Sequence, residues 1–497
     1  MPRLLLTITA LLTVLAIGCG GDSSSSSSAP ASLVPAGAPV YAEANLHPSG
    51  EQQAAINSII EKFPGQGSAG ERIRGLLEKA LSKSDTGLSY SKDIEPWLGD
   101  QAGFFVFSLG NDGGHMSGAA VVATDDEDAA QAAVDKAKGG RDASYKGHDY
   151  RTFDDDAAAG VVDGWVVIGT EGAFKAAVDT AEGGNSLDDD DKFQDAIGDA
   201  ADDRLGFVYV DTPSLAKRLQ GAGAPVGPFA DIFKDPVVAT VNATAQGVRI
   251  ESKLPKSFSA AIPFFGEGGD LAGDLPADSW LALSVPNLGE TLSGVFSAFS
   301  ANGAGIGALS KQLEAATGID IQRDVLSWMG DASIFVRGTS VDRLNGALVI
   351  ETKDEAASGR FIDTVAGLVR NAGKVTRSPG GYTLRTSGLP QPIHLFQRDG
   401  KVVLAYGDAA AHDALDPGRR LADSQAYKDA QDALGGGYDL AFFLSFPQIV
   451  QLVDSTGAGD DETWLKIKPY LEPLGAVAAG GKKEGDEVRS ALGVSVR

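Results

Sequence analysis

The sequence predicts an α+β fold made of two tandem copies of one domain, each a largely antiparallel sheet covered by helices. Three observations support this prediction. A tryptophan-containing segment recurs in the second half of the chain, Asp-Gly dipeptides precede valine-rich runs in both halves, and apolar residues recur at helical spacing between these runs. Hairpin signals combined with helical periodicity favour an antiparallel sheet with helices packed on it.

The internal repeat defines the expected domains. Residues 86–100 resemble residues 317–331, with six of fifteen positions identical, and the flanking blocks keep the same order. The shared positions include Asp93, Trp97, Gly99 and Asp100 in the first half, and Asp324, Trp328, Gly330 and Asp331 in the second. A repeat this long indicates a duplicated domain, because solenoid units are only about 20–50 residues long. We therefore expect domains at 33–255 and 274–497, joined by a linker at 256–273.

Each copy is expected to open with a strand, at 39–45 and at 280–285. Pro35 with Tyr41 in the first copy is matched to Pro276 with Trp280 in the second. In the first copy, Ser49 and Gln52 form a capping-box pattern before a helix whose apolar residues share one face. Neighbouring strands are then expected at 103–108 and 118–124, and correspondingly at 333–337 and 346–352.

Both copies continue with a tight hairpin. Asp163-Gly164 and Asp399-Gly400 are each followed by a valine-rich run, the sequence signal of a type I′ turn. In the first copy, helices are expected at 171–181 and 192–200, followed by a strand at 206–210. A last pair of strands, at 237–243 and 247–253, is expected to close the first copy.

The repeated tryptophan has two interpretations. Trp97 or Trp328 beside a carboxylate is compatible with ligand binding. The structural interpretation is favoured, because Asp93 and Asp324 can cap a short helix, and Gly99 and Gly330 can end it with a positive φ angle. The tryptophan then anchors this turn to the core of each copy, since a buried indole removes a large apolar area from water.

The N-terminus predicts lipid anchoring. Arg3 precedes an apolar run that ends at Ala16-Ile17-Gly18-Cys19, and Cys19 is the one cysteine of the chain. This segment resembles a bacterial lipobox, so residues 1–18 are expected to be a signal peptide and Cys19 to carry a diacylglycerol. The serine-rich residues 19–32 would then form a flexible tether. The alternative is an ordinary secretory signal with a coincidental cysteine. Either way, we expect an extracytoplasmic protein.

Charge and composition exclude several kinds of partner. Lys and Arg number 42 against 67 Asp and Glu, a net charge of −25. So acidic a chain is not expected to bind nucleic acid, and its charge cannot hold it on anionic lipid. The acidic runs at 124–128, 154–156 and 188–191 lack the alternating ligands and the distal glutamate of a calcium loop. We expect no metal and no cofactor.

No catalytic pattern stands out. The sequence has no Gly-x-Ser-x-Gly elbow, no phosphate-binding Gly-x-x-x-x-Gly-Lys motif and no metalloprotease helix. The five histidines lie in unlike contexts, and 67 carboxylates are too many to single out a catalytic pair. No catalytic residue is therefore assigned, and the protein is expected not to be an enzyme.

The lipobox, the serine tether and the two copies together resemble a group of uncharacterised bacterial lipoproteins built on a domain of unknown function. The motifs that carry the resemblance are Pro35-Ala36 with Tyr41, and Trp97-Leu98-Gly99-Asp100. The high Ala, Gly and Asp usage suits an actinobacterial source. The resemblance implies no activity and no functional residues.

Three functions remain open from the sequence. The preferred hypothesis is a non-enzymatic, lipid-anchored envelope protein that acts as a binding or scaffold module, attached to the membrane through its anchor. The second is a carrier of a lipid or other apolar ligand in a cavity between sheet and helices. The third is a carboxylate-dependent hydrolase, which requires two facing acids of perturbed pKa in a concave site. The protein or small-molecule partner is not identified by the sequence.

Overall fold

The computed structural model describes residues 29–65, 69–82, 86–108, 110, 116–198, 204–221, 226, 233–255, 271–301, 312, 314–315, 318–371, 373–485 and 487–497. The predicted signal peptide, Cys19, most of the serine tether and residues 256–270 of the predicted linker lie outside these ranges. The chain divides into two compact units. The first comprises Met1–Val226 with Phe233–Ala245, and the second comprises Gly227–Ile232 with Gln246–Arg497.

The first unit combines strands with helices of at most 14 residues. Its strands are β1 (Val40–Asn45), β2 (Leu98–Ser108), β3 (Ser117–Thr124), β4 (Arg141–Tyr145), β5 (His148–Thr152), β6 (Ala157–Val162), β7 (Trp165–Thr170), β8 (Gly206–Val210) and β9 (Val237–Thr244). Its α-helices are α2 (Gly50–Glu61), α3 (Ala69–Ser82), α4 (Glu127–Lys136), α5 (Glu171–Ala181), α6 (Asp191–Ile197) and α7 (Thr212–Gly221). Short helices are η1 (Pro30–Leu33), η2 (Tyr90–Ile94), η3 (Glu95–Trp97) and η4 (Asp154–Asp156).

The strands of the first unit form one antiparallel sheet in the order β9-β8-β1-β2-β3-β7-β6-β5-β4. One face packs against η1, α5 and α6, around Tyr41, Phe105 and Trp165. The other face packs against α3, α4 and η2, around Trp97 and Val122. The sheet therefore carries a core on each face, because successive side chains of a strand point to opposite sides.

The second unit follows a similar succession of elements. Its strands are β10 (Gly247–Pro255), β11 (Ser279–Val285), β12 (Met329–Arg337), β13 (Asn345–Thr352), β14 (Lys374–Ser378), β15 (Gly381–Arg385), β16 (Ile393–Arg398), β17 (Lys401–Tyr406), β18 (Asp439–Ser445), β19 (Leu474–Glu484) and β20 (Glu487–Val496). Its α-helices are α9 (Leu288–Ala301), α11 (Glu355–Leu368), α12 (Asp408–Asp413), α13 (Gln425–Leu434), α14 (Phe446–Asp454) and α15 (Glu462–Leu471). Short helices are η7 (Ile321–Leu326), η8 (Val341–Arg343), η9 (Val369–Asn371), η10 (Leu421–Asp423) and η11 (Gly457–Asp460).

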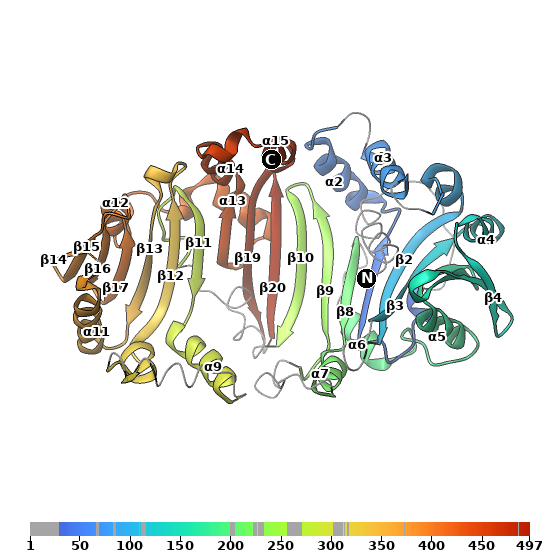
Figure 1. The fold of residues 1–497 in the computed structure, drawn as a ribbon, viewed down its shortest axis with the longest axis horizontal. Coiled ribbons are helices and arrows are strands. Elements are labelled where there is room, and N and C mark those ends of the chain that lie inside the picture. Colours follow the sequence, from blue (N-terminus) through green and yellow to red (C-terminus); the bar gives the residue numbers. More distant parts are fainter. Residues whose placement is uncertain are drawn as a thin grey trace. The chain divides into compact units, whose positions relative to one another are not determined.

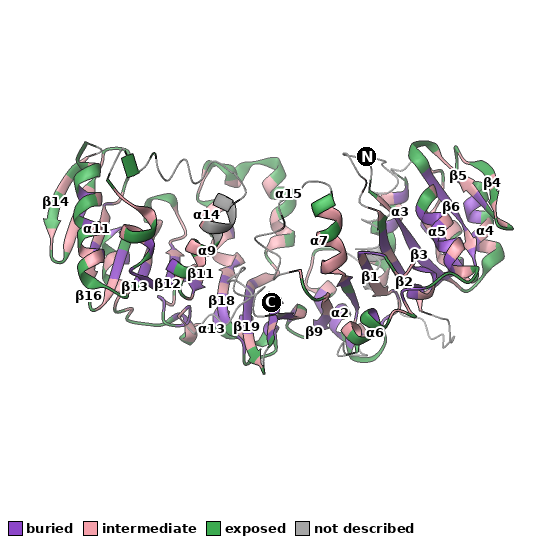
Figure 2. Ribbon diagram, turned by 90° about the horizontal axis from the view of Figure 1, so that it is seen from below, coloured by how far each residue is buried: buried purple, intermediate pink, exposed green. Residues whose placement is uncertain are grey.

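These strands form an antiparallel sheet in the order β10-β20-β19-β18-β11-β12-β13-β17-β16-β15-β14. In Figure 1 the order can be followed from β10 leftward to β14. In Figure 2 this sheet has α13 on one side, and α9 and α15 on the other. The predicted α+β class with a largely antiparallel sheet and covering helices is confirmed.

The strand β10 is grouped differently from the expectation. The sequence predicts that residues 247–253 close the first domain. In the structure, β10 pairs with β20 along its whole length, from Gly247 opposite Ser495 to Pro255 opposite Glu487. The compact units accordingly divide after Ala245, before the predicted linker. The pairing joins residues more than 230 positions apart, so local sequence could not reveal it.

The predicted Asp-Gly turns are confirmed. Asp163 and Gly164 have φ angles of 46° and 83°, and Asp399 and Gly400 have 53° and 71°. Two consecutive positive φ angles define the type I′ turn, which matches the twist of the flanking strands. Each turn joins a directly paired hairpin, with Val162 opposite Trp165 in the first unit.

Two local expectations are wrong. Ser49 is the N-cap of α2 but its side chain caps no backbone group, and Gln52 instead accepts a hydrogen bond from the amide of Ala243 at 2.8 Å. The Gln52 side chain is buried and satisfies the amide of Ala243 on β9, so it does not form the predicted capping-box bond. Trp280 does not match Tyr41, because it lies at a bulge between Ser279 and Leu281 and donates to the carbonyl of Gly338 at 3.0 Å.

Candidate functional site

The repeated tryptophan is part of a closed turn in both units. Trp97 is 4% exposed and Trp328 is fully buried. The indole Nε1 of each donates to a main-chain carbonyl four residues earlier, Trp97 to Asp93 at 2.5 Å and Trp328 to Asp324 at 3.1 Å. The tryptophans follow the π-helices η2 and η7. A buried indole whose N–H is satisfied by the turn itself offers no polar group to a ligand.

The aspartates of this motif act inside the turn rather than as its N-caps. A carboxylate oxygen of Asp93 accepts from the amide of Ser89 at 2.8 Å, and Asp324 accepts from the amide of Asp320 at 2.9 Å. In the second unit, Asp320 is the N-cap and accepts from the amide of Arg323. The expectation that Asp93 and Asp324 cap the helix is therefore correct only in that each satisfies an amide at the start of the turn.

The expected positive φ angles at Gly99 and Gly330 are wrong. Both glycines lie in strands, β2 and β12, and neither has the left-handed conformation. Their role is close packing between strands. A Cβ atom at Gly99 would lie 2.9 Å from the Cβ of Ala123, and one at Gly330 would lie 2.9 Å from the carbonyl oxygen of Glu351. Glycine is needed here because the adjoining strand approaches too closely for a side chain.

The last aspartate of each motif has a different partner. Asp100 lies 2.8 Å from Nδ1 of His47, and Asp331 accepts from the amide of Asn287 at 2.8 Å. Both contacts tie β2 or β12 to the segment that follows the opening strand. The eight predicted motif residues therefore form two separate structural turns, one in each unit, and not one shared site.

A buried carboxyl group lies on β1 of the first unit. The hydroxyl of Tyr41 donates to Glu43 at 2.8 Å. Burial raises the pKa of Glu43, although the Tyr41 hydrogen bond and the charge of Arg204 act in the opposite direction. Burial likewise raises the pKa of Tyr41. A carboxyl of raised pKa is a candidate proton donor, but the hydrolase hypothesis requires a second perturbed acid facing it. Asp188 is near enough to raise the pKa of Glu43 slightly.

A Thr–His–Asp arrangement occurs on β15, β16 and α12. The hydroxyl of Thr383 lies 3.1 Å from Nδ1 of His394, whose Nε2 lies 2.9 Å from Asp408 without hydrogen-bond geometry. Thr383 is 9% exposed and sits directly opposite His394 in the paired strands. A hydroxyl buried on the covered face of a sheet is not accessible to a substrate. The arrangement is a cross-strand structural pair.

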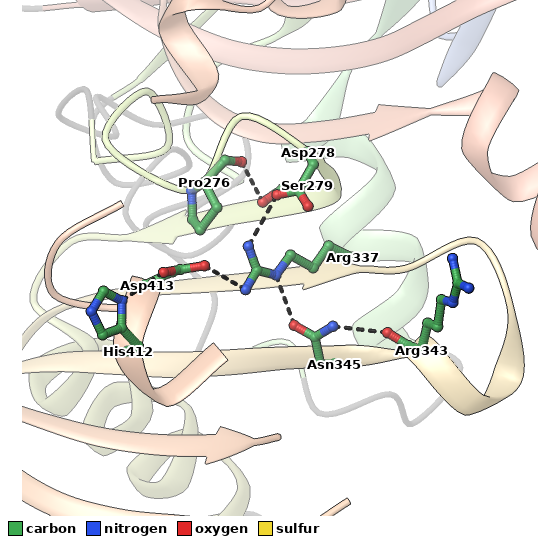
Figure 3. A network of polar contacts seen from close by, with 8 residues as sticks. All are labelled: Pro276, Asp278, Ser279, Arg337, Arg343, Asn345, His412 and Asp413. Atoms are coloured by element: carbon green, nitrogen blue, oxygen red, sulfur yellow. Dashed lines mark hydrogen bonds and ion pairs between the residues drawn. The ribbon is translucent and has the colours of Figure 1, made fainter. Parts of the chain in front are cut away.

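A polar cluster surrounds Arg337 at the end of β12. Its guanidinium donates to Asp413 at 2.6 Å, to Asn345 at 2.7 Å and to Asp278 at 3.2 Å, as Figure 3 shows. The Arg337 side chain is only 9% exposed. Burial acts to raise the pKa of Asp413, but hydrogen bonds from His412 and Arg337 outweigh it and hold that pKa below its usual range. All three nitrogens of the guanidinium are engaged, so the cluster fixes α12 to the sheet.

The second unit has an apolar sheet surface that its helices cover incompletely. One row crosses six adjacent strands directly opposite one another: Ile250, Leu492, Ala479, Phe442, Leu283 and Ile334. A second row runs beside it: Val248, Val494, Val477, Leu444, Leu281 and Val336. We call these two rows the open apolar face. Except for Ala479, every member is partly exposed, and Ile250 is 38% exposed.

The open apolar face lies opposite the covered core of the same sheet. Phe335, Phe443 and Ala478 alternate with its members and are buried against α12 and α13. Beyond Ile334 the row continues to Leu348 and Leu404, where α11 begins to cover it. Sequence reasoning missed this face. The available signal was that β18 and the middle of β20 (residues 491–494) are apolar on both sides, without the polar alternation of a strand that has one solvated face.

The first unit has a smaller counterpart. Ala239, Val208, Ala42 and Phe104 lie directly opposite one another on β9, β8, β1 and β2. All four are at least partly exposed, and Val208 is 37% exposed. Smaller side chains at two of these positions give this row less apolar area than the row of the second unit.

The described residues contain neither a metal-binding cluster nor a membrane-spanning helix. Within the described ranges, no group of three or more His, Cys, Asp or Glu side chains is placed to hold a metal ion. Across those same residues, no helix combines the length and the hydropathy that crossing a bilayer requires.

Comparison with known proteins identifies the family. Residues 4–472 match the family described as "Protein of unknown function (DUF3352)". The chain belongs to the DUF3352 family. The match covers most of both compact units and ends before β19, and it confirms the expectation of a family built on a domain of unknown function. No curated protein matches the sequence.

Two solved structures of TP0453 show a distant likeness. Crystal form IV has 11% sequence identity and a TM-score of 0.26, and the alignment covers 48% of this chain and 84% of that chain. Crystal form I has 10% identity and a TM-score of 0.25, with 46% and 80% covered. A likeness at this level transfers neither fold nor function.

Proposed function

We propose that this DUF3352 protein is a lipid-anchored, extracytoplasmic envelope protein that binds an acyl chain on the open apolar face without catalysis. The observation that carries the proposal is the continuous apolar surface across six strands of the second unit. Monomeric proteins rarely leave contiguous apolar surface exposed unless a ligand, membrane or partner uses it. The anchor at Cys19 places the protein where acyl chains are available.

The size of the face suits a single acyl chain. Neighbouring strands lie about 4.8 Å apart, so the five steps from Ile250 to Ile334 span roughly 24 Å. An acyl chain occupying one leaflet extends about 15 Å, half of the hydrocarbon thickness of a bilayer. The chain can therefore lie across the strands within one row. The face itself contains no charged side chain, so a charged head group would remain at its margin.

We further infer that the two units arose by tandem duplication. The order of pairing supports this inference, because β8-β1-β2-β3-β7-β6-β5-β4 corresponds strand by strand to β18-β11-β12-β13-β17-β16-β15-β14. Isolated details also recur. Asp126 caps α4, which follows β3, and Asp354 caps α11, which follows β13. The carbonyls of Trp97 and Trp328 accept from the amides of Asp125 and Lys353, respectively.

Ligand binding is tested with the full chain and a fluorescent fatty acid. Replacing Ile250 and Leu492 together by glutamine places polar groups on the first two strands of the first row, and should weaken binding at least tenfold. Leu76→Gln is the matched control, because Leu76 is 58% exposed on α3 of the first unit and lies outside the face. Equal affinity for the double variant and the parent chain would exclude the face as the binding site.

A stability measurement separates an open face from an ordinary packed core. Leu404, which continues the first row two strands beyond Ile334, is 44% exposed. Leu404→Gln should change the unfolding free energy by no more than about 0.5 kcal/mol, as expected for a surface position. A loss of several kcal/mol would mean that the surface is core. The anchor is tested separately by metabolic labelling with palmitate, which should mark the parent chain and not Cys19→Ser.

A further inference from the structure

Three cations lie side by side on the covered face of the second unit. Lys253 on β10 is directly opposite Arg489 on β20, and Arg489 is directly opposite Lys482 on β19. Like charges at directly opposed positions destabilise a sheet. In a chain of net charge −25 this arrangement is unexpected. We call Lys253, Arg489 and Lys482 the cation row.

One carboxylate lies among these cations. Arg489 Nη2 is 2.9 Å from Glu484, and Lys482 Nζ is 3.8 Å from the same side chain. The hydrogen bond from Arg489 lowers the pKa of Glu484, and the charges of Lys482 and Lys253 act in the same direction. Glu487 lies directly opposite Glu484, and the two form the last pair of β19 and β20 before the turn that joins them. Glu484 therefore lies close to Arg489 and Lys482, and the charge of Lys253 also acts on it.

A further acid beside the cation row, Glu251, is committed to different partners. Glu251 accepts from the hydroxyl of Tyr438 at 2.5 Å and lies 3.1 Å from Nε of Arg249. Arg249 also donates to the carbonyl of Leu434, at the C-terminus of α13, where the helix dipole favours a cation. Arg249 and Glu251 are therefore a structural pair beside the cation row.

Within the cation row, Arg489 keeps donor capacity, and Arg489 and Lys482 keep access to solvent. Across the described residues, Nε of Arg489 is buried and has no hydrogen-bond partner. The Arg489 and Lys482 side chains are 30% and 34% exposed, so a ligand can reach them. Lys482 is held in place, with its Nζ 4.7 Å from the ring centre of Tyr438. A buried guanidinium N–H without an acceptor is costly unless an acceptor arrives.

We propose that the cation row binds a tetrahedral oxyanion of the phosphate class. Arg489 supplies planar, directional donors and the two lysines supply point charges, which is the usual combination for phosphate. The bound anion would separate the three like charges and accept from Arg489. The same chemistry is found in free phosphate and in the phosphomonoester head group of a lipid. The proposal is independent of the acyl-chain proposal, because the row lies on the opposite face of the sheet.

Two arms of one experiment test the site and identify its source. Isothermal titration of the full chain with inorganic phosphate at low ionic strength measures free-anion binding. Co-sedimentation of full-length Cys19→Ser, which cannot carry the predicted diacylglycerol, with vesicles of phosphatidylcholine containing phosphatidic acid measures head-group binding. Pure phosphatidylcholine vesicles are the reference. Because the protein is strongly acidic, charge alone would repel it from the anionic vesicles.

Arg489→Gln and Lys253→Gln should each lower affinity at least tenfold in whichever arm shows binding. Lys466→Gln is the matched control, since Lys466 is 77% exposed and paired with Glu462 on α15. Lys253→Gln leaves the Arg489–Glu484 contact intact, so it remains informative if Arg489→Gln unfolds. Binding of phosphate identifies a free-anion site, and binding only to the phosphatidic acid vesicles identifies a head-group site. No binding in either arm, or unchanged binding by the variants, overturns the proposal.

Discussion

The indole of Trp328 donates its N–H to the main-chain carbonyl of Asp324, one helical turn earlier. The indole is fully buried, and its ring centre lies 5.5 Å from that of Phe361 on α11. The residue therefore joins the π-helix η7, the start of β12 and the helix α11. Trp97 makes the corresponding bond to Asp93 in the first unit.

Trp328→Ala should destabilise the second unit by about 3–5 kcal/mol, because it removes a buried aromatic side chain and leaves a cavity. Trp328→Phe should cost about 1–2 kcal/mol, chiefly through the lost hydrogen bond and volume. Calorimetry of the full chain should show the second unit's transition lowered and the first unit's unchanged, with the reverse for Trp97→Ala. Trp464→Ala is the control, since Trp464 is only partly buried on α15. A small effect of Trp328→Ala would contradict an anchoring role.

Asp324 gives the second unit a defined acid sensitivity. A hydrogen bond from Arg323, together with the amide of Asp320, lowers its pKa to about 2. The unfolded value is about 3.9. Because the folded pKa is the lower one, the stabilising contribution is complete above about pH 4 and is lost as the pH falls to about 2.

The stability difference between the parent chain and Asp324→Asn should therefore shrink across this interval. Melting temperatures of the two chains measured between pH 2 and pH 5 test this expectation. Arg323→Gln should move the loss of stability to higher pH, since the chief cause of the lowered pKa is gone. A difference that is independent of pH throughout the interval would contradict the assignment.

Glu43 should have the opposite effect. Burial raises its pKa, so ionisation of this carboxyl opposes folding as the pH rises above the usual glutamate range of about 4.3. Glu43→Gln keeps an acceptor for the Tyr41 hydroxyl and removes the charge. The variant should melt higher than the parent chain at pH 7–8, with the difference disappearing below about pH 4. A variant that is less stable at neutral pH would show that the charged form is required.

A feature of this fold could be predicted where the interactions that determine it lie within a few residues of the sequence. The Asp163-Gly164 and Asp399-Gly400 turns were predictable, because two consecutive left-handed residues are needed and these residues adopt them readily. The structural role of Trp97 was also suggested by its surrounding turn residues. Gly99 was misjudged because its requirement comes from Ala123 on another strand.

Long-range features could not be obtained from one sequence. The pairing of β10 with β20 depends on which edge of a sheet is available, and no local signal specifies that. The open apolar face depends on the register of six strands together, so its members are not recognisable as a group in the sequence. The cation row has the same origin, since Lys253 and Arg489 become neighbours only through that pairing.

Arg337 provides the sharpest test of the polar cluster in the second unit. Its guanidinium is nearly buried, and its partner Asp413 is 28% exposed. Asp278 is 69% exposed, so solvent can replace Arg337 as its partner at little cost in stability. Removing the cation leaves the Asp413 carboxylate partly buried without its main partner. Arg337→Met should therefore destabilise the second unit by about 3 kcal/mol, near the lower end for breaking a buried ion pair.

A double variant distinguishes the pair from simple loss of packing. Arg337→Met combined with Asp413→Leu removes both charges, and replacement of a whole ion pair by apolar residues is often neutral. The double variant should therefore be more stable than Arg337→Met alone, by at least about 1 kcal/mol. Chemical denaturation of the four chains of this cycle gives the coupling energy. If the two single effects simply add, Arg337 stabilises α12 through its stem and not through Asp413.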